Sequence, residues 1–225
     1  DFRWQTYFDV DESGVFGTPK RPFFEIGLTK GDGITRAVVP IVVASPSTPR
    51  IVVAEVSAGT MASQGAEDEF VELYNAGDVV VDMTGWSLKK RSSSGSESTL
   101  VASAAFRGTI APHSFFLIAH QQFVDAPSPD LRYSANSVNL AYTNNSVVLY
   151  DDADQIVDLA HWEEIPKGGS VERKAFRGGC SLAVGDGIFA GNGCDTGADS
   201  DFDVRAAREP QNTGSLPEPR IGPML

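Results

Sequence analysis

The sequence predicts an all-β protein, because short apolar runs that suit strands recur along the chain and helical periodicity is nearly absent. The runs are rich in Val, Ile, Phe and Tyr, and they are bounded by Gly, Pro, Ser and Asn. No window keeps apolar residues at i, i+3, i+4 and i+7 through three turns. About eight such runs fall within about 165 residues, and this spacing is typical of a β-sandwich.

The composition is that of a globular protein with a packed core. The chain has 225 residues, of which 41% are hydrophobic and 21% are charged. Its formal net charge is −12 and its pI is near 4.6. A chain this acidic repels phosphate backbones and anionic membrane surfaces at long range. We therefore expect a protein partner and no nucleic acid.

Targeting signals are not evident in the sequence. No stretch approaches 18 consecutive apolar residues, so we expect no transmembrane helix and no direct membrane insertion. The sequence starts at Asp1 with neither an initiator Met nor a signal peptide. We expect a processed product or a fragment.

Residues 1–45 form a β-rich N-terminal segment. Three strand-like runs occur in it, at Trp4–Val10, Pro22–Thr29 and Ile34–Val43. Three strands are few for an independent domain. The segment is therefore expected to be the end of a preceding domain or an arm that donates strands to another chain. Two prolines among small residues indicate a stiff linker at residues 46–49.

Residues 50–216 are predicted to form the main domain, followed by an extended tail at 217–225. The run at 69–75 alternates polar and apolar residues, as a half-buried strand does, and the run at 115–119 is continuously apolar, as a fully buried strand is. Residues 91–99 and 121–135 are interpreted as loops. The predicted strands are 50–56, 69–75, 79–83, 86–90, 115–119, 170–174 and 201–205, with a hairpin at 146–150 and 155–159; residues 109–110 lead into a predicted turn at 111–114.

The two cysteines, Cys180 and Cys194, bracket a Gly-rich stretch. No His or further Cys stands near them to complete a four-ligand zinc site. A structural disulfide is the preferred interpretation, and two buried free thiols are the alternative. Closing a loop of this length stabilises a fold by roughly 3 kcal/mol. A disulfide would place the protein in an oxidising compartment, extracellular or at the cell surface.

A series of short motifs appears in a fixed order along the main domain. They are Glu55–Val56, Glu69–Asn75, Asp82–Leu88, Gly108–Ala119, Asn139–Leu140, Val147–Trp162, Ser170–Arg173 and Asp201–Asn212. This ordered set resembles the lamin tail domain as it occurs in bacterial surface and secreted proteins. The resemblance covers most of residues 51–212 and extends over about 50–216.

The resemblance implies an immunoglobulin-like β-sandwich of the lamin-tail type. It also implies a module of larger proteins, sometimes placed beside nuclease, phosphatase or adhesion-type domains. Some lamin members bind DNA, but this chain is strongly acidic and has no basic patch. DNA binding is therefore not carried over to it.

Several of the matched residues suit structural roles. Trp86 follows a Gly turn and begins an alternating strand, so it is expected to anchor the core. Glu72 and Asn75 lie on the polar phase of their strand or at its end. Asp82 precedes a Thr-Gly turn, where its carboxylate can accept turn N–H groups.

No catalytic constellation is found, and the chain is predicted not to be an enzyme. The histidines, His113, His120 and His161, are not spaced for a metal on one strand face, and no Gly-x-Ser-x-Gly elbow occurs. The loose dinucleotide fingerprint at Gly185–Ala190 lies between the cysteines with no helix near it. We interpret it as a loop.

Two clusters of acidic residues admit calcium as an alternative to a solvated surface. The first, Asp9–Gly14, begins like an EF-hand loop but reaches Lys20 where the loop needs Glu. The second consists of Asp195, Asp199, Asp201 and Asp203; Asp201 and Asp203 are expected to share one face of the last strand. Another acidic group, Glu67, Asp68, Glu69 and Glu72, is interpreted as a solvated strand edge and not as a glycosidase pair.

The preferred functional prediction is a non-catalytic extracellular structural or interaction module that binds protein through its sheet surfaces and edges. In its sharper form, the N-terminal arm adds strands to a neighbouring copy and builds a filament or surface layer. Two alternatives remain open. One is an accessory domain of a secreted hydrolase such as a nuclease or phosphatase, and the other is a carbohydrate-binding β-sandwich.

Overall fold

A computed structural model describes the backbone of three N-terminal strands and most of the rest of the chain. The described residues are 4–5, 23–30 and 33–40 for the backbone, and 49–59, 68–134, 140–176, 180 and 190–218 with side chains. Contacts divide the chain into two compact units, Asp1–Ser47 and Thr48–Leu225.

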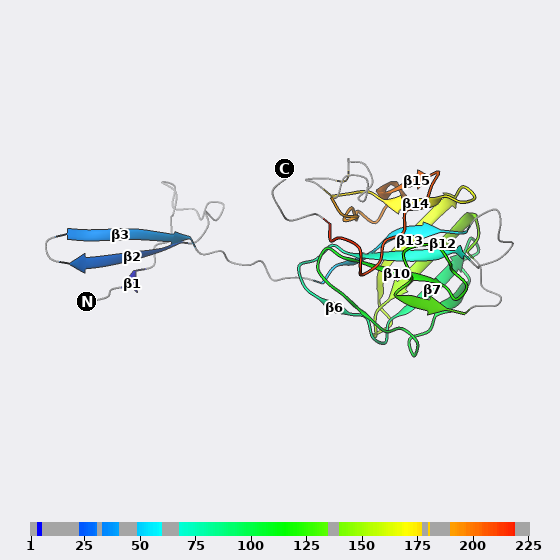
Figure 1. Ribbon diagram of the computed structural model, residues 1–225, viewed down its shortest axis with the longest axis horizontal. Helices are drawn as coiled ribbons and strands as arrows, with labels where there is room; N and C mark the ends of the chain where they lie inside the picture. Colours follow the sequence, from blue (N-terminus) through cyan, green and yellow to red (C-terminus); the bar gives the residue numbers. More distant parts are fainter. Residues whose placement is uncertain are drawn as a thin grey trace. The chain divides into compact units, whose positions relative to one another are not determined.

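The first unit contains a three-stranded antiparallel sheet in the order β1-β2-β3. Strand β2 (Phe23–Lys30) pairs with β3 (Gly33–Pro40) along its whole length, as Figure 1 shows. The short β1 (Trp4–Gln5) pairs with β2 on its other side. Strands are therefore present at the start of the first run that the sequence predicts and through most of the other two.

The second unit is built from two large sheets and one small one, and its all-β, immunoglobulin-like architecture confirms the predicted fold class (Figure 1). The six-stranded sheet has the order β11-β10-β5-β4-β14-β15, the four-stranded sheet β13-β12-β7-β8, and the small sheet β6-β9. The strands are β4 Ile51–Ser57, β5 Phe70–Asn75, β6 Val81–Asp82, β7 Ser87–Ser92, β8 Glu97–Val101, β9 Thr109–Ile110, β10 Phe115–His120, β11 Leu131–Tyr133, β12 Thr143–Tyr150, β13 Ile156–Glu164, β14 Ser170–Arg173 and β15 Phe202–Arg205. No described helix is long and apolar enough to cross a membrane.

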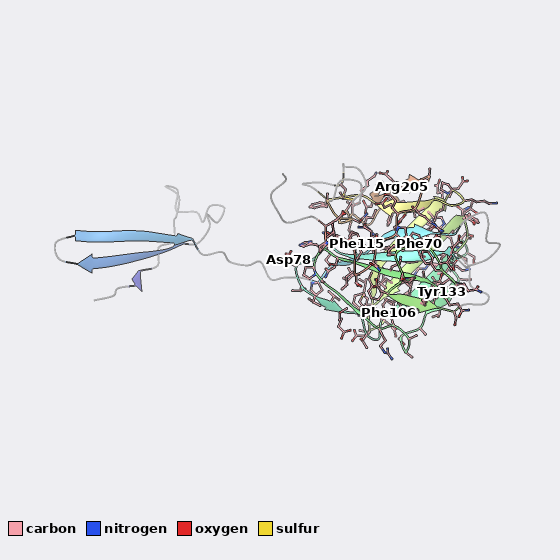
Figure 2. All side chains as sticks on the ribbon, viewed as in Figure 1. Phe70, Asp78, Phe106, Phe115, Tyr133 and Arg205 are labelled. Atoms are coloured by element: carbon pink, nitrogen blue, oxygen red, sulfur yellow. A yellow bond between two sulfur atoms is a disulfide. The ribbon has the colours of Figure 1, made fainter. Side chains whose placement is uncertain are left out.

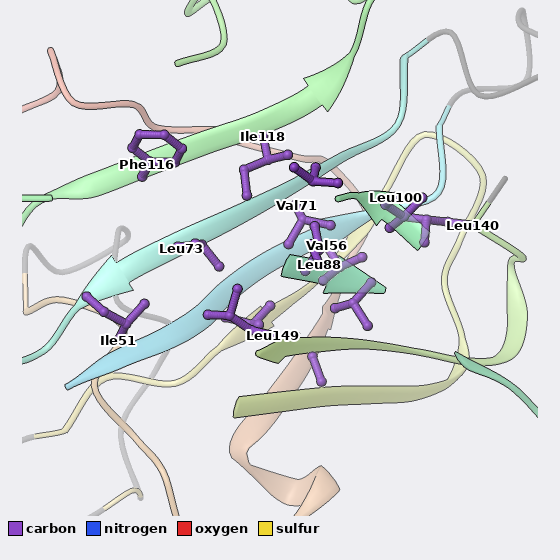
Figure 3. Packing of buried hydrophobic residues seen from close by; sticks show 14 of the residues in the cluster. Ile51, Val56, Val71, Leu73, Leu88, Leu100, Phe116, Ile118, Leu140 and Leu149 are labelled. Atoms are coloured by element: carbon purple, nitrogen blue, oxygen red, sulfur yellow. The ribbon is translucent and has the colours of Figure 1, made fainter. Parts of the chain in front are cut away.

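The main core lies between the two large sheets. Val71 and Leu73 of β5 belong to the same buried cluster as Leu88 of β7 and Leu149 of β12 (Figure 3). Trp162 of β13 is 3% exposed, and its indole N–H donates to the Ala141 carbonyl at 2.9 Å. Trp86, the expected anchor, is only partly buried against this cluster, so Trp162 fills the larger role.

The six-stranded sheet is covered on both faces. All six residues of β5 are buried, so the prediction of a half-buried strand was wrong. Two further apolar clusters lie on the outer face, one around Tyr74 and Phe115 and the other around Phe70 and Phe123. The labelled phenylalanines of these clusters and Phe106 of the main core are shown in Figure 2. Residues 206–218, called here the C-terminal strap, also bond to this face.

Two segments interpreted as loops contain strands. Residues 91–99 include the end of β7, the turn of the β7–β8 hairpin and the start of β8, and Arg91 stands opposite Glu97. Residues 121–135 include β11, which pairs in parallel with the end of β10. Neither strand has the apolar run that sequence reasoning relies on, because tertiary pairing and not local propensity holds them.

The interpretation of Asp82 as a turn acceptor is confirmed. Its Oδ1 accepts the Thr84 N–H at 2.9 Å. A hydrogen bond from the Thr84 side chain, and then this backbone bond, lower the pKa of the Asp82 carboxyl group. The turn continues through Gly85, whose φ of 87° lies in the left-handed region that favours glycine. The chain then passes from the small sheet to β7, and not into a hairpin between neighbouring strands.

Asn75 closes β5 with three hydrogen bonds. Its side-chain amide donates to the carbonyls of Val79 at 2.7 Å and Ile110 at 3.1 Å, while its Oδ1 accepts the Gly77 N–H at 3.0 Å. The residue is fully buried. It therefore has the structural role expected of it, because a buried amide is tolerated when its donors and acceptor are paired.

Candidate functional site

The outer face of the four-stranded sheet carries a connected group of charged and aromatic side chains, called here the Tyr150 network. The alternation of β7 points Leu88 into the core and its neighbour Lys89 outward. Arg91 donates to Glu97 Oε1 from both Nε, at 3.1 Å, and Nη2, at 2.7 Å. The Tyr150 hydroxyl donates to the same oxygen at 2.7 Å, and Lys89 lies 4.3 Å above the Tyr150 ring.

Hydrogen bonds and charges within the network favour the charged forms of Glu97 and Arg91. The hydrogen bond from Tyr150 and then those from Arg91 lower the pKa of Glu97 to about 2. The Glu97 contact also raises the pKa of Arg91. The side chains of Lys89, Arg91 and Glu97 are 30%, 29% and 25% exposed. The three charged side chains are thus held in one geometry and remain accessible around Tyr150, which is itself only 9% exposed. This arrangement suits recognition more than catalysis.

The opposite sheet carries a row of three buried glutamates under the C-terminal strap. Glu55 is the register partner of both Glu72 and Glu172. Glu55 accepts the backbone N–H of Glu209 at 3.2 Å, and Glu72 accepts that of Gln211. The solvated-edge interpretation was therefore wrong for Glu72, which is 2% exposed.

Ion pairs and hydrogen bonds hold Arg205 and the C-terminal strap against the six-stranded sheet and its loops. Arg205 donates to Glu172 at 2.7 Å on β14. Arg208 forms ion pairs with Asp68, at 3.3 Å, and with Asp125. Further along, Thr213 donates to Asp130 through both its N–H, at 3.1 Å, and its hydroxyl, at 2.5 Å. The strap is consequently held mainly by carboxylates that accept from it.

A buried carboxyl group lies at one end of the sandwich. Glu69 is fully buried, and it accepts the Tyr133 hydroxyl at 2.6 Å and the Leu140 N–H at 2.8 Å. Burial raises the pKa of Glu69 to about 7, although both hydrogen bonds and the charge of Lys90 lower it. The solvated-edge interpretation was also wrong for Glu69. The available signal was its phase, because Glu69 shares one face of the strand with the core residues Val71 and Leu73.

The three histidines bond to different partners and form no joint site. His113 Nε2 lies 3.2 Å from Asp78, and His161 Nδ1 lies 2.9 Å from Asp199. His120 is buried at the end of β10, with its ring edge-on to Tyr133 at 5.7 Å between centroids.

Cys180 and Cys194 form the expected disulfide, with their Cα atoms 5.1 Å apart. Among the described residues, one group of potential metal ligands is compact: the two cysteine sulfurs and an Asp201 carboxylate oxygen, all within 4.8 Å of one another. Both sulfurs belong to the disulfide, so neither is a thiolate that could bind a metal.

The four aspartates of the second acidic cluster point to separate partners. Asp199 contacts His161, Asp203 lies 3.3 Å from Lys174, and Asp195 lies 3.9 Å from Arg50. Asp201 ends a short 3-10 helix and is buried, so it does not share a strand face with Asp203 as expected. Calcium binding stays a prediction. The first cluster, Asp9–Gly14 with Lys20, lies outside the described residues.

One buried cation was not recognised from the sequence. Arg173 of β14 is 1% exposed, and its guanidinium donates to the carbonyls of Val53 at 2.7 Å and Cys194 at 2.6 Å. It also donates to Asp158 of β13 at 2.5 Å and lies 4.5 Å from the Phe202 ring. Arg173 therefore joins the two sheets and the disulfide-bonded segment.

Comparison with known families gives one match. A family model described as the Lamin Tail Domain matches residues 44–164. The match spans β4 to β13, while β14, β15 and the disulfide lie beyond it. No curated protein matches the chain.

Proposed function

Because the chain belongs to the lamin tail domain family, we propose that it is a non-catalytic structural and interaction module that binds protein through the outer face of its four-stranded sheet. The family consists of immunoglobulin-like domains that suit structural and interaction roles. The fold carries no chemistry by itself, so the proposal depends on a particular surface of this chain.

The observation that carries the proposal is the difference between the two large sheets. The six-stranded sheet has its outer face covered by the C-terminal strap and by apolar clusters. The four-stranded sheet presents the Tyr150 network on its outer face. Arg is enriched at interfaces, and charged side chains that are already held in place lose little freedom on binding.

Two further features support a protein partner and an oxidising compartment. A net charge of −12 favours a protein partner with basic groups over nucleic acid. The Cys180–Cys194 disulfide favours an oxidising compartment, so the proposed location is extracellular or at the cell surface.

We further propose that copies of the chain associate through the N-terminal strands. In the described part of this unit, β3 forms the edge of its sheet and pairs with β2 alone. An edge strand offers backbone N–H and C=O groups to a strand of another chain. Repeated addition of this kind would build a filament or layer.

Sedimentation velocity over a range of concentrations tests the strand-addition proposal, and it tests the outer face as a contact between copies. The full chain is expected to form larger species as its concentration rises, and deletion of residues 1–45 should leave monomers. The double variant Lys89→Glu/Arg91→Glu, which reverses two charges of the Tyr150 network, should weaken assembly if copies bind through this face.

The control for charge reversal is Lys167→Glu, an exposed position outside the network. It should assemble like the unaltered chain, and all variants should melt at similar temperatures. A full chain that is monomeric throughout, or a deletion variant that assembles normally, would disprove the strand-addition proposal. Assembly that survives the double charge reversal would show that copies do not meet through the Tyr150 network.

A further inference from the structure

Two side chains with complementary chemistry are diagonal neighbours on the core side of the four-stranded sheet. In the β7–β12 pair, Lys90 stands opposite Val147 and Asn145 stands opposite Ser92. Val147 belongs to the main core, so its register partner Lys90 and the next residue of that phase, Asn145, are on the core side. Diagonal positions in an antiparallel pair lie within reach of a long side chain.

The Asn145 amide occupies a dry environment. The residue is 4% exposed, and its other register partner is the buried Trp162. Its Oδ1 is buried and has no hydrogen-bond partner among the described residues. A buried carbonyl without a donor is rare in folded proteins and requires an explanation. Such an amide carbon is also shielded from hydrolysis by water.

A buried carboxyl group, that of Glu69, lies at the same end of the core. Glu69 accepts the Leu140 N–H, and Leu140 lies just before β12, the strand that carries Asn145. The positive charge of Lys90 lowers the pKa of Glu69, which places the ammonium within electrostatic range of this carboxyl group. The other groups that act on Glu69 are Tyr133, which donates a hydrogen bond, and Asp68, which raises its pKa.

We propose that Lys90 and Asn145 become joined by an amide bond between the lysine Nζ and the asparagine Cγ, with Glu69 transferring the proton. The Lys90 ammonium first gives a proton to the Glu69 carboxylate. The neutral Nζ then attacks Cγ of Asn145 and forms a tetrahedral intermediate. Glu69 returns its proton to Nδ2, the Cγ–Nδ2 bond breaks, and ammonia leaves as the second Nζ proton is released.

The reaction balances without an oxidant or a co-reactant. One Nζ–Cγ bond forms, one Cγ–Nδ2 bond breaks, and one molecule of ammonia leaves, which takes up the released proton as ammonium. A carboxyl group whose pKa lies near neutral can both accept and return a proton, which is what this step requires. The product ties β7 to β12 covalently within the core.

Intact mass spectrometry of the full chain, after reduction of its disulfide, tests the proposal directly. The expected mass is that of the sequence minus one molecule of ammonia. After proteolysis, tandem spectra should show the peptide containing Lys90 joined to the peptide containing Asn145. The variants Lys90→Arg, Asn145→Ala and Glu69→Gln should each restore the full mass.

Two matched controls distinguish this bond from other losses of ammonia. Lys89→Arg changes the neighbouring lysine on the opposite face of β7, and Asn144→Ala changes the exposed asparagine beside Asn145; both should keep the mass deficit. Full mass in the unaltered, folded chain would overturn the proposal. A deficit that persists in Lys90→Arg, or that maps to a succinimide at another asparagine, would overturn it as well.

Discussion

Replacement of Arg173 by methionine is expected to lower the free energy of unfolding by about 3–5 kcal/mol, the range for breaking a buried ion pair from one side. Methionine keeps much of the side-chain volume but removes every donor. The Asp158 carboxylate would then lose its cationic partner inside the protein, and the carbonyls of Val53 and Cys194 would lose their hydrogen-bond donor. Burial already raises the pKa of Asp158 against the effect of Arg173, so an unpaired carboxylate there is costly.

Urea denaturation of the oxidised protein, followed by tryptophan fluorescence, measures this effect. In the double variant Arg173→Met/Asp158→Asn, the free energy of unfolding should fall by less than the sum of the decreases in the two single variants. The double variant has no unpaired buried charge, and the asparagine side chain at position 158 keeps an oxygen for the Val53 N–H. Arg205→Met serves as the control, since the Arg205 side chain is 24% exposed. Equal losses for Arg173→Met and Arg205→Met would contradict the role assigned to Arg173.

The second large effect is a dependence of stability on pH that originates in Glu69. The folded-state pKa of about 7 lies above the ordinary value of 4.5. Between these two pH values the folded chain holds a proton that the unfolded chain has lost, so the free energy of unfolding falls as the pH rises. A difference of this size corresponds to about 3 kcal/mol, present in full below pH 4.5 and lost above pH 7.

Denaturation midpoints measured at intervals between pH 4.5 and 8 test this expectation. Glu69→Gln cannot ionise, so its stability should change much less over this range than that of the unaltered chain. The variant also sets an amide against the Leu140 N–H, so we expect a lower stability in acid. An unchanged pH profile in Glu69→Gln would assign the dependence to another group.

The parts of the fold that sequence reasoning predicted are those with a strong local pattern. The apolar run at 115–119 became a buried strand, and the acidic turn at 151–154 joins the hairpin of β12 and β13. Asp82 also occupies the turn role that its Thr-Gly neighbours indicate. In these cases the determining interactions lie within a few residues of one another, so the sequence displays them.

The parts that it missed depend on distant segments. Glu72 reads as a solvated residue because it lies on the polar phase of its strand, but Gln211 covers it from 139 positions away. Arg173 reads as an ordinary strand residue, and only the meeting of β14 with β13 shows its partner Asp158. The Tyr150 network likewise joins β7, β8 and β12, and no single window of sequence contains it.

The C-terminal strap has a consequence for the order in which the domain matures on the ribosome. Residues 206–218 are synthesised after every strand of the sheet that they cover. During translation, Glu55 and Glu72 therefore lack these two backbone donors until Glu209 and Gln211 emerge and dock. The amide protons of these two late residues should become protected from exchange only in the last step, which makes them reporters of a completed domain.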